Sequence, residues 1–240
     1  MATWKLFKDG ELINENSSGL FDFPKNTGKT EVSYIVEYID NEGNISEQVC
    51  TVLTGTTCRP IIDGHEYVDL GLPSGTKWAT MNIGASVEAQ IGNYYQYGKG
   101  SAQYAATSGQ SDYSGTENPL SMSVDSARQV WGGRWHTPTK TQVEELIANT
   151  SHQYTENFEC TGVSGVIRTA SNGNYIFLPA CGQYLSGSLD FTSLALLWTS
   201  TPNTYNGNKT AYFIDGSTTD IRVRGDLGRS YGRPIRPVVG

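Results

Sequence analysis

The 240-residue chain is long enough for one large or two small domains, and its 11% aromatic content excludes a disordered chain. A net charge of −7 and a pI near 5.0 argue against nucleic acid or an anionic membrane as the main partner. No apolar run has the length of a membrane-spanning helix. A hydrophobic fraction of 37% with 27 glycines predicts a loop-rich protein with a modest core.

The N-terminus lacks the basic and apolar regions of a signal peptide. The chain is then cytosolic, exported without a cleaved signal, part of a virion, or trimmed. We expect trimming, because the first strand begins abruptly at Trp4, and we expect the protein outside the cell, on a cell surface or on a phage virion.

Residues 1–56 have the pattern of a small all-β domain. Trp4 to Lys8 alternates and runs into Asp9-Gly10, a hairpin signal. A short strand follows at Gly19 to Phe23. A second hairpin joins Val32–Ile39 to Ile45–Leu53. This region resembles the second half of a bacterial immunoglobulin-like domain without its first two strands, which implies either adhesion or a spacer.

Residues 57–240 are expected to form a second domain. Strands are predicted at Tyr67–Leu72 and Lys77–Ala79, then a helix over Val87 to Tyr97, where apolar side chains fall on one side. Gly98 to Leu120 is poor in apolar residues and indicates a surface excursion. Asp125 to Trp131 predicts a short helix that ends at a glycine pair.

The best-defined local signal follows Pro138. Thr139 and Gln142 have the spacing of a capping box, so we predict a helix from there to about Asn149. A hairpin of Gly165–Thr169 and Asn174–Leu178 comes next. Short strands continue to the C-terminus, separated by segments rich in Gly, Asn, Thr and Ser.

The last stretch, from Leu197 to Gly240, is the expected binding region. Tyrosine and arginine are frequent anchors of binding surfaces, and five arginines with one aspartate lie between Arg222 and Arg236. Leu194 to Leu197 is an apolar cluster that predicts either an exposed patch or a buried strand. The predicted ligand-binding residues are Phe191, Ser193, Leu196, Tyr205, Asn206, Tyr212, Arg222, Arg224, Asp226, Leu227, Arg229 and Tyr231.

Strand alternation and position in the chain indicate which residues of this region face outward and which support the fold. Arg222 and Arg224 alternate with Ile221 and Val223, so the arginines should share one strand face and the aliphatic residues should face the core. Arg233 and Arg236 belong to the closing segment and are predicted to support the fold. A core under the binding face is predicted from the tryptophans Trp78, Trp131, Trp135 and Trp198.

Three stretches together carry a resemblance to a family. They are Tyr67 to Ala79 with Asn82 to Ala85, then Gly132 to Thr139, and then Leu197 to Thr201 with Gly232 to Val238. In this order they resemble the major paralogous domain of Fibrobacter and Bacteroides-type bacteria. That family is related to the formylglycine-generating-enzyme-like branch of the C-type lectin fold. The resemblance implies an α+β fold in which two main helices pack on twisted antiparallel sheets, with a loop-rich half presenting the binding face.

The same fold is used by the variable proteins of diversity-generating retroelements. In these proteins, asparagine codons mutated at adenines never become Trp, Met, Gln, Lys or Glu. From Tyr184 to Gly240 these five types occur only as Trp198 and Lys209. The resemblance therefore implies a diversified binding surface. The alternative is that short loops rich in Gly, Thr and Asn simply avoid long charged side chains.

The residues that enzymatic and metal-binding relatives need are missing. Cys160 and Cys181 do not fit the copper-binding cysteine pair of the related oxidase, and Thr201-Pro202-Asn203 lacks the acidic calcium ligands of a C-type lectin. The four cysteines have no zinc-site spacing, and leave open whether they form disulfides or buried thiols. We therefore predict no catalytic residue, no metal and no cofactor.

The predicted function is non-covalent recognition of a protein or a glycan on another surface. One alternative is a structural, fimbria-like surface subunit whose loops vary. A further alternative is an oxidase of the formylglycine-generating type. The oligomeric state is left open.

Overall fold

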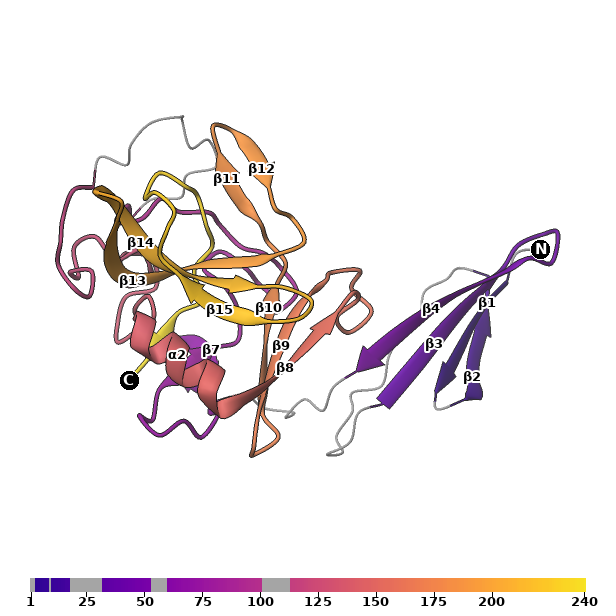
Figure 1. Cartoon of the computed structure of the whole chain (residues 1–240). Coiled ribbons are helices and arrows are strands. Elements are labelled where there is room, and N and C mark those ends of the chain that lie inside the picture. The colour runs from indigo at the N-terminus through magenta and orange to yellow at the C-terminus, as the bar shows by residue number, and fades with distance from the viewer. Residues whose placement is uncertain (1–2, 9, 18–31, 53–59, 101–112) are drawn as a thin grey trace. The chain divides into compact units, whose positions relative to one another are not determined.

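The structure, a computed structural model, describes residues 3–8, 10–17, 32–52, 60–100 and 113–240 (Figure 1). It divides into two units. The first unit contains Met1–Cys58 and Glu156–Val163, and the second contains Arg59–Thr155 and Ser164–Gly240. The strand predicted at Gly19 to Phe23 lies outside the described residues.

The first unit is built on one antiparallel sheet with the order β2-β1-β3-β4. Its strands are β1 (Thr3–Lys8), β2 (Glu11–Asn16), β3 (Val32–Ile39) and β4 (Ile45–Val52). Both predicted hairpins are confirmed, because β1–β2 and β3–β4 pair around their polar turns. Leu6 is buried in this sheet, and the rings of Trp4 and Tyr38 lie 4.6 Å apart on paired positions.

The described part of the second unit contains several small antiparallel sheets (Figure 1). One has the order β10-β9-β8, with β8 (Thr150–Thr155), β9 (Gly165–Ala170) and β10 (Tyr175–Pro179), which confirms the predicted β9–β10 hairpin. A hairpin joins β11 (Gln183–Leu185) to β12 (Ser188–Asp190). The sheet β13-β14-β15 contains β13 (Ala195–Tyr205), β14 (Asn208–Gly216) and β15 (Ile221–Arg224).

The closing sheet joins the two ends of the second unit. Its order is β16-β7-β6-β5, with β5 (Ile61–Ile62), β6 (His65–Val68), β7 (Lys77–Ala79) and β16 (Val238–Val239). Val238 pairs with Trp78 across β16 and β7. The guanidinium of Arg236 donates to the carbonyl oxygens of Thr80 at 2.8 Å and Phe177 at 2.7 Å. Because these bonds join β7, β10 and the C-terminal segment, Arg236 is structural, as predicted.

Helix α2 (Lys140–Asn149) covers one face of the β13-β14-β15 sheet (Figure 1). Thr139 is its N-cap, and the predicted capping box with Gln142 is present. Val143 and Leu146 are fully buried in the same cluster as Trp78, Leu197 and Ile214. None of the helices among the described residues is long and apolar enough to cross a membrane.

A second core cluster lies on the other face of the same sheet. Its residues alternate along β13 with those of the first cluster. It contains Tyr97, Trp198 and Phe213. Arg233 is fully buried against it, 4.1 Å from the ring centroid of Trp198 and 3.8 Å from that of Phe213, and donates to Gln183. Burial lowers the pKa of Arg233 to about 9. Because this value is still above neutral pH, the guanidinium stays charged. Arg233 is therefore structural, as predicted.

The predicted tryptophan core under the binding face is confirmed only in part: Trp198 is in the second core cluster, against which Trp131 packs, whereas Trp78 is buried in the cluster under α2. Trp135 is fully buried. Trp131 differs, because it is only half-buried and stacks on His65 with ring centroids 3.8 Å apart. The short helix predicted at residues 125–131 is confirmed as α1 (Ser126–Val130), whose N-cap Asp125 accepts from the backbone N–H groups of Ala127 and Arg128.

The expected α+β fold with two main helices is wrong. About 42% of the described residues lie in strands, and the helices described are α1, with 5 residues, and α2, with 10 residues. The observed architecture is mostly β, in several small antiparallel sheets, with α2 as its one substantial helix in the described ranges.

The helix predicted over Val87 to Tyr97 does not form. Gly92 has a φ of +79°, and a Cβ there would lie 2.4 Å from the carbonyl oxygen of Ile83. The backbone N–H of Asn93 donates to that oxygen at 2.8 Å, and Tyr95 exchanges backbone hydrogen bonds with Arg233. The apolar side chains that suggested a helix are buried or half-buried, but the backbone of this segment bonds to Ile83 and Arg233, not to its own preceding turn.

Candidate functional site

The β13–β14 hairpin presents the turn that was predicted to point outward. Tyr205 pairs with Asn208, and Asn206 and Gly207 between them have φ values of +49° and +76°. Two positive φ values are typical of the tight hairpin turn that Asn-Gly favours. Tyr205 is 50% exposed beside this turn, so both predicted residues lie at the surface.

The loop after β15 is fastened across the same hairpin. The carbonyl oxygen of Gly225 accepts from the side chains of Asn203 at 2.7 Å and Thr210 at 2.6 Å. A Cβ on Gly225 would lie 2.7 Å from Asn203 and from the ring of Tyr212, so only glycine allows this approach. The crossing places Asp226 and Leu227 next to the β13–β14 turn.

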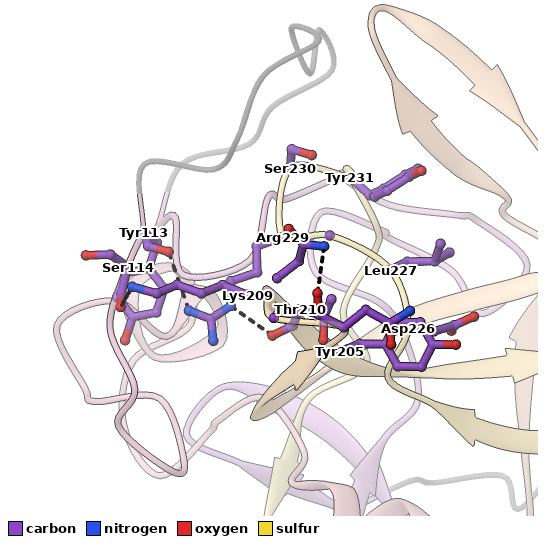
Figure 2. Close-up of a pocket in the computed structure, with 14 residues that line it drawn as sticks. Tyr113, Ser114, Tyr205, Lys209, Thr210, Asp226, Leu227, Arg229, Ser230 and Tyr231 are labelled. Atoms are coloured by element: carbon purple, nitrogen blue, oxygen red, sulfur yellow. Dashed lines mark hydrogen bonds between the residues drawn. The ribbon is translucent and has the colours of Figure 1, made fainter.

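Arg229 holds this loop to a third segment. Its side chain donates to the carbonyl oxygens of Thr210 at 2.9 Å and Tyr113 at 3.4 Å (Figure 2). It also donates to the carbonyl oxygen of Gly115 at 2.6 Å. The guanidinium also lies 5.0 Å from the ring centroid of Tyr97. Arg229 is 4% exposed. Arg229 therefore lines the pocket as a buried side chain whose donors are directed at backbone carbonyls.

The three segments surround a pocket of about 870 Å³ (Figure 2). It lies beside the second core cluster, against which Tyr113, Leu227 and Tyr231 pack. Its lining is Tyr113, Ser114, Tyr205, Asn206, Gly207, Asn208, Lys209, Thr210, Asp226, Leu227, Gly228, Arg229, Ser230 and Tyr231. Of the predicted site residues, the structure brings together Tyr205, Asn206, Asp226, Leu227, Arg229 and Tyr231.

Several polar groups of this lining are uncommitted. Within the described ranges, no hydrogen bond engages the hydroxyl groups of Tyr205, Ser230 and Tyr231 or the side-chain amide of Asn206. By contrast, the Tyr113 hydroxyl donates to Glu117 at 2.5 Å, and burial together with this bond raises the pKa of Tyr113 to about 12. The free groups are all neutral, and each can donate and accept a hydrogen bond.

Two arginines and two aspartates beside the pocket pair with one another. Arg224 donates through Nε to Asp226 at 3.1 Å, and its Nη2 binds the second carboxylate oxygen. These bonds hold the pKa of Asp226 below its ordinary value and raise that of Arg224. Arg222 and Arg224 both reach Asp215 at 3.2 Å, which confirms that the two arginines share one strand face.

The remaining predicted residues do not line the pocket. Leu196 is 3% exposed in β13, so the exposed-patch alternative is wrong for it; the strand is buried because its side chains lie in both cores. Tyr212 is half-buried, with the Lys140 ammonium 5.1 Å from its ring. Phe191 and Ser193 are exposed on the loop after β12.

Sequence reasoning missed one wall of the pocket. Tyr113 and Ser114 come from the segment that was read only as a surface excursion, and the Lys209 ammonium donates to the Ser114 carbonyl oxygen at 2.9 Å (Figure 2). No spacing in the sequence connects this segment to the C-terminal region. Ser230 and Asn208 lie within two residues of predicted site residues. The turn-forming residues around them were the signal that could have identified them.

The cysteines are structural in the described part of the chain. Cys160 is disulfide-bonded, whereas Cys181 is a free thiol that is 1% exposed. Burial raises the pKa of Cys181 to about 12. The described residues contain no group of three or more His, Cys, Asp or Glu side chains that could hold a metal ion.

Comparisons with known proteins give no relative for this chain. No protein-family model, curated protein or solved structure matches it. The resemblance to the major paralogous domain therefore stays a prediction from the three sequence stretches.

Proposed function

We propose that this chain is a non-enzymatic ligand-binding protein, and that the pocket between Tyr113, Tyr205 and Tyr231 is its binding site. The observation that carries the proposal is that three separate segments meet there and leave neutral hydrogen-bonding groups unused. The volume of about 870 Å³ is within the usual range for small-ligand sites. Tyr, Ser, Asn and Gly dominate the lining, as they do in antibody binding loops.

The lining favours binding over catalysis. Among the described lining residues, the carboxylate of Asp226 is held by Arg224, and the guanidinium of Arg229 is directed at backbone carbonyls. Ser230 has no histidine beside it in the lining to act as a base. These contacts support recognition through hydrogen bonds and aromatic rings.

We also propose that the face can change while the frame stays constant. We define the face as four of the exposed or half-buried lining residues, Tyr205, Asn206, Ser230 and Tyr231, and the frame as the buried Trp198, Arg233 and Arg236. All of them lie in the segment that lacks Met, Gln and Glu. Gene sequences from many isolates are expected to differ at the face and to agree at the frame. Substitutions spread equally over both sets would contradict this idea.

The binding site is tested with the full chain against two probes, an array of immobilised oligosaccharides and a displayed library of random peptides. Tyr231→Ala and Tyr205→Ala are expected to weaken binding to the selected probe at least about tenfold. Phe191→Ala is the matched control, because Phe191 is 53% exposed, close to the 50% of Tyr205, but lies outside the pocket lining. The proposal fails if neither probe is bound, or if Phe191→Ala alone removes binding.

A further inference from the structure

We infer that the pocket binds a neutral, polyhydroxylated ligand, that is, one end of an uncharged oligosaccharide. This inference rests on the proposed function and names the ligand class for the same site. It follows from three properties of the described lining: the kind of hydrogen-bonding groups left free, the state of the charges, and the tyrosine rings.

The free groups match sugar hydroxyls. The hydroxyls of Tyr205, Ser230 and Tyr231 and the amide of Asn206 have no hydrogen-bond partner among the described residues. Each of these groups offers both donors and acceptors, as a sugar hydroxyl does.

The charges around the pocket favour an uncharged ligand. Arg224 binds both carboxylate oxygens of Asp226, so this acid is already neutralised. The guanidinium of Arg229 is buried and shared among backbone carbonyls. Among the described lining residues, Lys209 is the exposed cation without an acidic partner, and its ammonium donates to the Ser114 carbonyl oxygen. A ligand with several charges would therefore lose hydration without gaining matched partners.

The tyrosine rings supply the apolar contact. Tyr205 and Tyr231 come from different segments and lie at separate places around the pocket (Figure 2). A pyranose ring carries slightly positive C–H groups on its face, and an aromatic ring presents a negative face to them. A volume of about 870 Å³ is in the usual range for small-ligand sites and suits the end of such a chain. A protein partner would instead need a contact surface of roughly 800 Å² on each side.

Binding is measured by titration calorimetry of the full chain with oligosaccharides chosen from an array of neutral and acidic members. Tyr231→Ala is expected to weaken binding at least about tenfold, and Tyr231→Phe, which keeps the ring, about threefold to tenfold. Asn206→Gly keeps the positive-φ turn and removes the amide, and a similar threefold to tenfold loss, about one hydrogen bond, is expected. Ser230→Ala removes one of the free hydroxyls of the lining. Its control is Ser193→Ala, because Ser193 is exposed outside the lining.

The outcomes separate this inference from the proposed function. Binding of a neutral oligosaccharide that Tyr231→Phe and Asn206→Gly weaken supports the inference. Selective binding of acidic oligosaccharides that Lys209→Ala removes would overturn it. Binding of selected peptides alone, lost in Tyr231→Ala, would overturn the ligand class and leave the proposed site standing. If no probe binds, both proposals are wrong. Circular dichroism of each variant confirms that it is folded.

Discussion

Arginines that are close together in the C-terminal sequence have different structural roles. Arg222 keeps 63% of its side chain exposed and pairs with Asp215, whereas Arg229 is buried and binds three backbone carbonyl oxygens. The fixed, planar arrangement of guanidinium donors allows one side chain to serve several acceptors. Arg229 therefore positions the segment at Tyr113 against the β13–β14 hairpin.

Arg229→Lys tests this role at the residue scale. An ammonium group cannot reach all three carbonyls, so the free energy of unfolding should fall by about 2–3 kcal/mol. Arg222→Lys is the matched control and should change it by no more than about 0.5 kcal/mol, because the side chain is 63% exposed, lysine keeps its charge, and Arg224 still pairs with Asp215. Urea unfolding measures both. Equal small losses in the two variants would show that Arg229 does not fasten the pocket wall.

Asp226 should make stability depend on pH. Its pKa is lowered in the folded state, mainly by the hydrogen bonds from Arg224, so its ionised form stabilises the fold. That contribution is present above the unfolded pKa, near pH 4, and is lost as the pH falls through the folded pKa. The difference in unfolding free energy between wild type and Asp226→Asn should be constant near neutral pH and shrink below about pH 4.

The control for this pH series is Glu66→Gln. Glu66 is exposed, and no ion pair engages it among the described residues. Its variant shows how stability responds when one exposed carboxylate is removed. A difference for Asp226→Asn that grows as the pH falls would contradict the pairing with Arg224.

At the element scale, local signals were reliable where an element satisfies its own backbone. The capping box of Thr139 and Gln142 predicted α2, and polar turns predicted the β1–β2, β3–β4 and β9–β10 hairpins. The segment from Val87 to Tyr97 shows the limit. Its apolar spacing fits a helix, but its backbone hydrogen bonds go to Ile83 and Arg233. A periodic pattern records which side chains are buried and says nothing about the backbone partner.

Gly92→Ala tests why that helix is absent. Gly92 and Gly187 share a φ of +79°, but a Cβ at Gly92 meets the Ile83 carbonyl oxygen at 2.4 Å, while at Gly187 no atom lies within 4 Å. Both alanines should cost about 1 kcal/mol for the positive φ, and Gly92→Ala about 1–3 kcal/mol more for the clash. Thermal and urea unfolding report the difference. Equal losses would mean that the close approach to Ile83 is not fixed.

At the scale of the whole second unit, two core clusters share one sheet. Residues of β13 alternate between them, with Leu197 in the cluster under α2 and Leu196 and Trp198 in the other. The same sheet thereby supports α2 on one side and the pocket on the other. Opening the pocket frame should therefore require unfolding of the unit as a whole.

Cys181 reports on this unfolding. Its thiol is buried, and burial raises its pKa to about 12, so it should resist alkylation by iodoacetamide in the native protein. Its reaction in urea should follow the loss of tryptophan near-ultraviolet circular dichroism, because Cys181 belongs to the same cluster as Trp78. Peptide mapping identifies the alkylated cysteine. Rapid labelling of Cys181 without urea would show that the cluster opens locally.

The sequence by itself determined the features that depend on neighbouring residues. These are the capped helix, the hairpins with Asn-Gly or Asp-Gly turns, and the exposure of Tyr205 and Asn206. It also indicated that Arg233 and Arg236 support the fold. The helix and the turns follow from local backbone geometry, whereas the role of the two arginines was inferred from their place in the closing segment.

Only the tertiary structure decided the balance of helix and strand, the burial of Leu196 and Arg229, and the wall formed by Tyr113 and Ser114. These features depend on contacts between residues far apart in the chain, such as Arg229 with Gly115 and Tyr95 with Arg233. Composition and spacing do not encode such pairs. They form because buried donors and acceptors must find partners wherever the folded chain brings them.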